Sequence, residues 1–228
     1  MNNLRLVYFK MRALAEAPQL MLHYTGTPYS YEMAWEYFGQ PWSEVKTSVA
    51  YRQLPMLVVD NDTRICQSGA ITRFLAQLTG LQPEDPLVRG EVDALYETSQ
   101  EMFMPLNPTI NFAVGEKFES VKSELLEQIH PRLADFERLL NAKPDMPFFF
   151  GETPFYCDFG VFHHVNLALF LDEGLLGAYP RLREFMSTLE GLAGVREYLA
   201  NRPELIGVGT QPQLVIDGVA RPTGVVNE

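Results

Sequence analysis

The sequence predicts an α/β domain followed by an all-α domain, and three observations support this fold class. Residues 4–66 contain four short segments with the alternating or β-branched character of strands. Residues 81–86, Leu-Gln-Pro-Glu-Asp-Pro, have the composition of a linker. Beyond the linker, apolar residues follow a helical period and no strand pattern appears for about 120 residues. We therefore expect one domain at 1–80 and a helical domain with a C-terminal tail at 87–228.

The first elements of the α/β domain follow from apolar patterning. Residues 4–9 alternate and predict a strand, and residues 13–24 predict a helix. The Gly-Thr-Pro turn at 26–28 precedes a second predicted strand at 29–34. Residues 35–52 are mixed and aromatic, which predicts irregular structure with a short helix.

The remaining elements complete this domain. Residues 56–60 predict a third strand, and an Asn-Asp turn leads to a fourth at 63–66. From Ser68 the period becomes helical, with Ser68 in the expected N-cap position and Gly80 at the end. The order β-α-β-(α)-β-β-α is that of a thioredoxin-like domain.

Three helices are recognisable in the second half of the chain. A long amphipathic helix covers 121–140, a deeply buried one begins near Phe159, and a third covers 182–189. The Gly- and Pro-rich tail after Pro203 is expected to wrap the surface.

The charge balance excludes several classes of partner. Lys and Arg number 18 against 29 Asp and Glu, which gives a formal net charge of −11. We found no basic stripe to attract a phosphate backbone, so nucleic acid is not an expected partner. No apolar run reaches the roughly 18–20 residues that cross a bilayer, and the first residues lack a signal-peptide core. We expect a cytoplasmic protein with no membrane partner.

The cysteines and the adjacent histidines do not predict a metal site. Cys66 and Cys157 lie far apart and form no paired metal-binding motif, so we interpret them as reduced, buried thiols. His163 and His164 are neighbours on a predicted helix and point about 100° apart, so they cannot share one ligand face.

The segment Gln-Leu-Pro-Met-Leu at 53–57 is the first feature that indicates ligand binding. A proline at the start of a central strand removes a hydrogen-bond donor from the sheet. A cis Leu54-Pro55 bond would turn the backbone of Leu54 outward, where it could pair with an extended peptide. The alternative is an ordinary trans proline at a strand start.

A second feature is the pair Gln67 and Ser68 at the start of a predicted helix. Free backbone N–H groups and the helix dipole at such a position favour a carboxylate. The hydroxyl of Ser68 could add a hydrogen bond to that carboxylate. The alternative is a plain N-cap serine.

Together these motifs resemble the glutathione S-transferase family, nearest to its sigma class, which includes glutathione-dependent prostaglandin D synthases. In chain order the matching pieces are Tyr8-Phe9, Arg12, Ala15-Glu16, the Trp-x-x-x-Lys segment at 42–46, the Leu-Pro segment at 53–57, Gln67-Ser68 with Ala70-Ile71, the 151–159 segment with Asp158, and Pro180-Arg181-Leu182. The resemblance covers both halves of the chain.

The resemblance implies a glutathione site and a homodimer. The catalytic residue would be Tyr8, whose hydroxyl would bind the glutathione sulfur. The implied tripeptide-binding residues are Trp42, Lys46, Gln53, Leu54, Pro55, Gln67 and Ser68. Glu97 of the partner subunit would complete the site for the γ-glutamyl amine, with Asp93 as the alternative.

The implied electrophile pocket lies between Tyr8 and the helical domain. Its candidate residues are Phe9, Met11, Arg12, Leu14, Met102 and Phe103, although Met102 and Phe103 could equally be core or dimer contacts. Glutathione is the expected co-substrate, and no metal is expected.

Three positions depart from the family pattern. Leu14 replaces a second arginine, Phe155 replaces the usual Ser or Thr N-cap before Asp158, and Gln53 replaces a lysine. Leu14 makes the predicted electrophile pocket next to the glutathione sulfur less polar. Phe155 weakens the capping box expected at the start of the buried helix.

The resulting hypothesis is a glutathione transferase that activates the thiol as a thiolate for conjugation to small apolar electrophiles. Two alternatives remain open: a dedicated glutathione-dependent isomerase or lyase, and a non-catalytic relative retained as a binding or structural protein, as in lens crystallins. The intact Tyr8, Gln67 and Ser68 argue against the second alternative.

Overall fold

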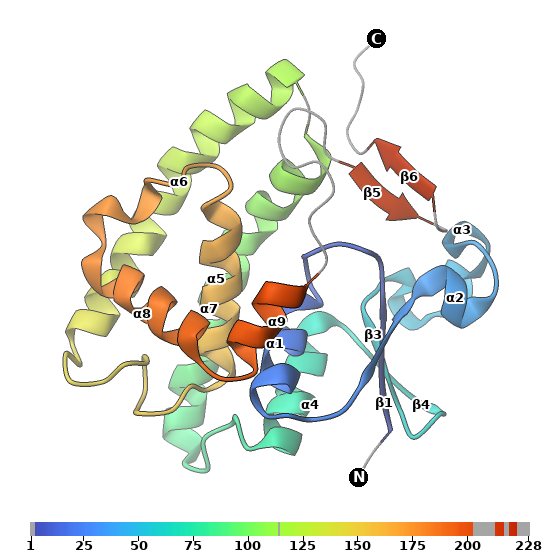
Figure 1. The fold of residues 1–228 in the computed structure, drawn as a ribbon, viewed down its shortest axis with the longest axis horizontal. Coiled ribbons are helices and arrows are strands. Elements are labelled where there is room, and N and C mark those ends of the chain that lie inside the picture. The colour runs from blue at the N-terminus through green and yellow to red at the C-terminus, as the bar shows by residue number, and fades with distance from the viewer. Residues whose placement is uncertain (1–2, 114, 203–212, 217–218, 223–228) are drawn as a thin grey trace.

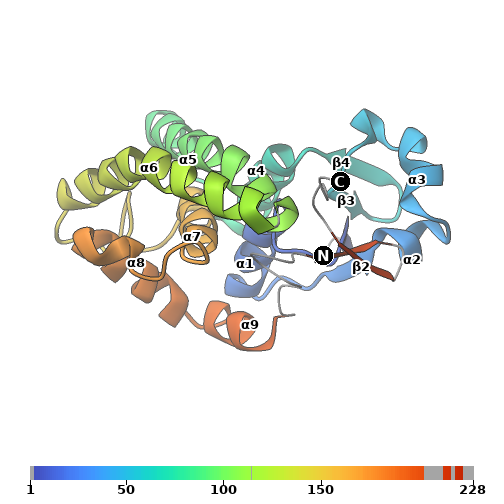
Figure 2. The ribbon, with the colours of Figure 1, turned by 90° about the horizontal axis from the view of Figure 1, so that it is seen from above.

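The computed structural model describes residues 3–113, 115–202, 213–216 and 219–222. It has an N-terminal domain built on a small mixed sheet and a helical C-terminal domain beside it (Figures 1 and 2). The elements of the first domain are β1 (Leu4–Tyr8), α1 (Glu16–Tyr24), β2 (Ser30–Met33), α2 (Ala34–Phe38), α3 (Trp42–Val45), the 3-10 helices η1 (Lys46–Ser48) and η2 (Ala50–Arg52), β3 (Met56–Val59), β4 (Thr63–Cys66) and α4 (Ser68–Thr79).

The sheet has the strand order β2-β1-β3-β4, with β1 parallel to β2 and antiparallel to β3. Strand β1 is central, and both Leu6 and Val7 are fully buried because helices cover the two faces of the sheet. The thioredoxin-like order is therefore confirmed. The segment 35–52 is more helical than expected, since α2, α3 and two 3-10 turns fill it.

The helical domain is organised around one buried helix. Its elements are α5 (Pro86–Phe112), α6 (Gly115–Asn141), α7 (Tyr156–Ala168), the 3-10 helix η3 (Leu175–Ala178), α8 (Pro180–Gly191) and α9 (Val195–Asn201). In α7 every residue except Asn166 is buried. The helix packs against α5 and α1, so it joins the two domains.

Two glycines permit close approaches that fix this packing. A Cβ on Gly160 would lie 3.0 Å from Tyr96, so the glycine lets α7 approach α5 closely. Gly194 has φ +77, and a Cβ there would lie 2.2 Å from the carbonyl oxygen of His23. This glycine places α9 directly against the end of α1.

The C-terminal region contains a strand pair that the sequence pattern did not predict. Residues 213–216 and 219–222 form an antiparallel hairpin, β5 (Gln213–Ile216) and β6 (Val219–Pro222), and β5 lies against α5. The rest of the expected tail lies outside the described residues.

Within the part of the chain that the structure describes, no helix is long and apolar enough to span a membrane.

Candidate active site

The carboxyl end of β1 places Tyr8 at the junction of the two domains. Its side chain is only 4% exposed, and burial raises the pKa of the phenol well above its ordinary value. The nearby backbone of Leu14 partly opposes this rise in the pKa. The phenol is therefore neutral under physiological conditions, so it can donate its proton in a hydrogen bond.

The start of β3 and the start of α4 lie together beside this strand. The Leu54-Pro55 bond is cis, as the sequence predicted. The side-chain amide of Gln67 donates to Oε1 of Gln53 at 3.3 Å, which brings the two predicted segments into contact. Gln67 has φ 73 and is the N-cap of α4, so Ser68 is the first helical residue. The expectation that Ser68 is the N-cap is wrong, because the chain turns one residue earlier through the left-handed conformation of Gln67.

Trp42 and Lys46 lie at the two ends of α3. The ring of Trp42 is half-buried, with its centroid 5.9 Å from that of Phe9 in an edge-on contact. Because Phe9 follows Tyr8 directly, this contact holds α3 near the end of β1. Lys46 is exposed, so its ammonium group is accessible to an anion.

The predicted electrophile residues occupy three different environments. Met11 and Arg12 line a cavity of about 440 Å³, while Leu14 lines a second cavity of about 10 Å³ together with Ser68. Met102 and Phe103 are only 4% and 2% exposed. Phe103 packs against His163 and His164 of α7. Met102 and Phe103 therefore belong to the core of the helical domain.

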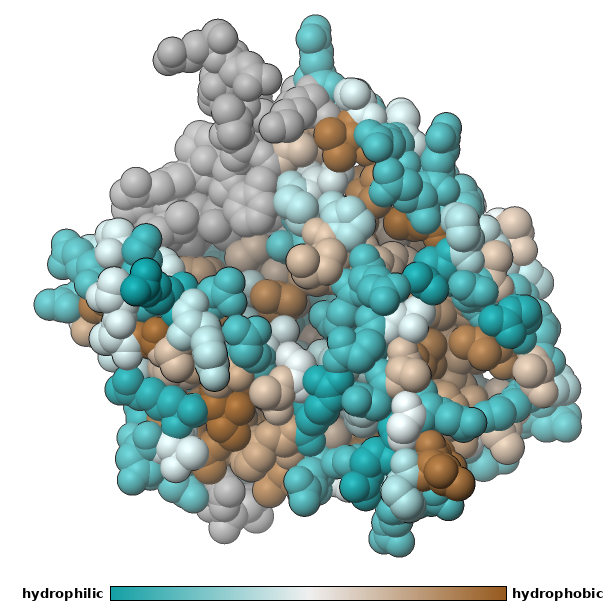
Figure 3. Space-filling view, turned by 180° about the vertical axis from the view of Figure 1, so that it is seen from behind, coloured by the Kyte–Doolittle hydropathy of each residue, from teal (hydrophilic) through white to brown (hydrophobic). Residues whose placement is uncertain are grey.

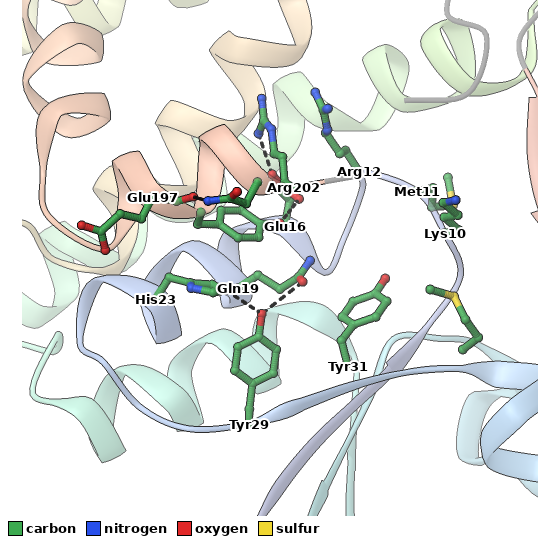
Figure 4. Close-up of a pocket in the computed structure, with 13 residues that line it drawn as sticks. Lys10, Met11, Arg12, Glu16, Gln19, His23, Tyr29, Tyr31, Glu197 and Arg202 are labelled. Carbon is green, nitrogen blue, oxygen red and sulfur yellow. Dashed lines mark hydrogen bonds and ion pairs between the residues drawn. The ribbon is translucent and has the colours of Figure 1, made fainter. Parts of the chain in front are cut away.

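The larger cavity lies between α1, β2 and α9, and sequence reasoning missed it (Figure 4). The hydroxyl of Tyr29 donates to Gln19 at 3.2 Å and contacts His23 at 3.1 Å. Arg202 pairs with the buried Glu16 at 2.7 Å. Most of the surface that remains available to a ligand is aromatic or aliphatic. One feature of the sequence could have indicated this cavity: the polar residues Glu16, Gln19 and His23 share one face of α1.

Helix α1 separates this cavity from the predicted glutathione residues. Glu16, Gln19 and His23 face the large cavity, whereas Leu14 and Ala17 face the small cavity that Ser68 also lines. The large cavity therefore does not coincide with the predicted glutathione site, although both adjoin the loop that follows β1.

Two acidic residues of α5 meet a cation of α4. Arg73 donates to Asp93 at 2.7 Å and also pairs with Glu97. The hydroxyl of Tyr156 donates to the same oxygen of Asp93 at 2.7 Å. Glu97 is the more exposed acid, with 58% of its side chain accessible against 41% for Asp93.

Burial disfavours the thiolate form of both cysteines. Cys157 is buried and Cys66 is half-buried, and burial raises the pKa of both above the ordinary value. Among the residues that the structure describes, no three His, Cys, Asp or Glu side chains are grouped to hold a metal ion.

Comparison with known proteins identifies the family. The glutathione S-transferase N-terminal domain matches residues 4–77, and the glutathione S-transferase C-terminal domain matches residues 102–202. Glutathione S-transferase Mu 2 of Mus musculus is 30% identical over 199 residues, covering 84% of this chain and 88% of the relative. The chain therefore belongs to the glutathione S-transferase family, as the resemblance predicted.

Other relatives and solved structures agree with this assignment. Glutathione S-transferase P of Caenorhabditis elegans is 27% identical over 215 residues, covering 91% of this chain and 99% of the relative. The Pi-class glutathione S-transferase of Onchocerca volvulus is 27% identical with a TM-score of 0.77, covering 88% of this chain and 93% of that one. Rat hPGDS in complex with a quinoline is 25% identical with a TM-score of 0.75, covering 89% and 98%.

Proposed function

We propose that this protein is a cytoplasmic glutathione transferase that uses Tyr8 to activate the thiol of glutathione for detoxifying conjugation. The observation that carries the proposal is the buried, neutral Tyr8 hydroxyl at the end of β1. A free thiol has a pKa of about 8.5, so only a few per cent is thiolate at neutral pH. A hydrogen bond from Tyr8 to the sulfur favours the thiolate and lowers this pKa.

The tripeptide would bind along polar groups of β3, α3 and α4. Its cysteinyl backbone would pair with the backbone of Leu54 in the manner of an added strand. The γ-glutamyl carboxylate would bind the N-terminus of α4 at Gln67 and Ser68, where the first N–H groups of the helix are unpaired. The glycyl carboxylate would bind Trp42 and Lys46. Gln53 and Pro55 flank this path.

The chemical step is a nucleophilic attack by the bound thiolate. Its sulfur forms a bond to an electrophilic carbon and the leaving group departs with the electron pair of the broken bond, while the thiol proton goes to solvent. The electrophile would lie against the loop 9–14, with Phe9, Met11, Arg12 and Leu14 at its surface and Met102 and Phe103 behind it. Leu14 makes this surface less polar, which suits apolar electrophiles.

Turnover with glutathione and a chloronitroarene tests the proposed function. We expect a conjugate to accumulate, with saturation in both substrates. Glutathione binding without turnover of any electrophile would favour a binding protein, and the absence of both would contradict the proposal.

The proposed enzyme is a homodimer in which the strand-rich half of each subunit faces the helical half of the other. Large apolar side chains lie exposed on the subunit, including Tyr51 at 70% and Leu87 at 80%. Figure 3 shows apolar side chains scattered among hydrophilic ones on one face of the molecule. Glu97 of the partner subunit would bind the γ-glutamyl amine.

A variant of Glu97 tests this arrangement. We expect Glu97→Gln to raise KM for glutathione about tenfold with kcat nearly unchanged, because a hydrogen bond to a charged group contributes roughly 1.5–3 kcal/mol. Glu101→Gln is the matched control, since Glu101 lies one turn further along α5 and pairs with Arg132. Sedimentation at micromolar concentration should give a dimer, and a monomer that retains full activity would contradict the arrangement.

A further inference from the structure

Tyr31 ties the first residue beyond the central strand to the neighbouring strand. Its hydroxyl donates to the backbone carbonyl of Phe9 at 2.6 Å. Burial raises the pKa of the Tyr31 phenol above its ordinary value, so the group stays protonated and can donate. The pairing register of β1 with β2 ends at Tyr8 and Met33, so Phe9 lies just outside it. The bond therefore extends the hold of β2 by one residue, into the loop that follows β1.

The carbonyl of Phe9 accepts a second hydrogen bond, from the backbone N–H of Met11 at 2.9 Å. A carbonyl oxygen has two lone pairs and can accept both bonds. The Met11 bond closes a tight turn within the loop, so it moves with the loop and cannot anchor it. The Tyr31 bond, by contrast, joins this turn to a different strand.

The anchored turn directs its side chains to two sides of the loop. The ring of Phe9 lies edge-on to that of Trp42, with the centroids 5.9 Å apart. Met11 and Arg12 instead line the cavity between α1, β2 and α9, together with Tyr31 (Figure 4). Phe9, Met11 and Arg12 all belong to the proposed electrophile surface, so the anchored carbonyl fixes the start of that surface.

We propose that Tyr31 is a positioning residue for the electrophile, because its bond to Phe9 holds the loop in the shape that forms the electrophile surface. This inference rests on the proposed function. Tyr8 precedes the loop and is paired with Met33 in the sheet, so the thiol site keeps its place without the bond. Without the bond the loop spends part of its time in other shapes. The apparent affinity for a ligand falls with the fraction of protein that is competent to bind it.

The variant Tyr31→Phe removes the hydroxyl and keeps the half-buried ring. At saturating glutathione we expect KM for a chloronitroarene to rise about three- to tenfold, with kcat changed less than about twofold. KM for glutathione and the pKa of its bound thiol should keep their wild-type values, because Tyr8 and the tripeptide-binding residues are untouched. A residue that served only stability would not raise the KM for one substrate alone.

The matched control is Tyr29→Phe. Tyr29 lines the same cavity, but its hydroxyl donates to Gln19 at 3.2 Å and contacts His23 at 3.1 Å, both on α1 (Figure 4). We expect this variant to leave KM for the chloronitroarene at the wild-type value.

An unchanged KM for the chloronitroarene in Tyr31→Phe would overturn the inference. An equal rise in Tyr31→Phe and Tyr29→Phe would do the same, as would a raised thiol pKa in Tyr31→Phe. Wild-type protein that conjugates no electrophile would instead refute the proposed function and the inference with it. That result comes from the wild type alone, so the two failures are distinguishable.

Discussion

Replacing Tyr8 with phenylalanine should raise the pKa of bound glutathione by about one to two units and leave its affinity nearly unchanged. The exchange removes one hydroxyl and keeps the buried ring, so packing is preserved. A hydrogen bond to a charged group contributes roughly 1.5–3 kcal/mol, and here it favours the thiolate over the thiol. The thiolate fraction at neutral pH, and with it turnover, should fall on the order of tenfold or more.

Ultraviolet titration of the bound thiolate in both proteins measures this effect directly. Tyr31→Phe is a matched control, because the hydroxyl of Tyr31 donates to the carbonyl of Phe9 at 2.6 Å and faces the cavity on the other side of α1. The same thiol pKa in wild type and Tyr8→Phe would show that another donor activates the sulfur.

Replacing Asp158 with alanine should lower the free energy of unfolding by about 3 kcal/mol. The carboxylate is fully buried at the start of α7, where it accepts from the backbone N–H of Phe155 at 2.8 Å and of Phe149 at 3.2 Å. Alanine leaves two buried donors without an acceptor, and each costs about 1–3 kcal/mol. Phe155 itself makes no side-chain cap, so only the Asp158 half of the capping box is present. Urea unfolding measures the change.

The same carboxyl group should make stability depend on pH. Burial raises the pKa of Asp158 to about 7, above the value of about 4 that it has in the unfolded chain. The folded protein therefore binds this proton more tightly than the unfolded protein does. Its contribution to stability is complete below about pH 4 and is lost as the pH rises to about 7.

An isosteric variant isolates this contribution. Between pH 4 and 7 the wild-type unfolding free energy should decline relative to that of Asp158→Asn, which cannot ionise. Asp172→Asn is a control, because Asp172 is exposed and caps a turn by accepting from Gly174 at 2.8 Å. A constant difference between wild type and Asp158→Asn across this range would contradict the assigned titration.

Local patterns were enough to predict the order of the first elements. Alternation and turn residues located the four strands, and Pro55 at a strand start, taken together with the Gln67-Ser68 motif, predicted the cis bond. The long helix α5 was not recognised individually, because Pro105 and Pro108 interrupt its pattern and yet are accommodated inside it. The C-terminal hairpin was missed although Asp217-Gly218, flanked by apolar residues, is a strong hairpin turn signal.

The surroundings of the site depend on contacts that no local pattern contains. Tyr198 donates to Glu16 at 2.9 Å across 182 positions of sequence, and this pair forms one wall of the large cavity. Both residues stand in the sequence, but only the packing of α9 against α1 brings them together.

A crystal structure of the complex with glutathione tests the central claim most directly. We predict that the sulfur lies within hydrogen-bond distance of the Tyr8 hydroxyl, that the cysteinyl backbone pairs with Leu54, and that the γ-glutamyl carboxylate binds the N-terminus of α4. Glutathione bound instead in the cavity between α1, β2 and α9, with its sulfur away from Tyr8, would contradict the account.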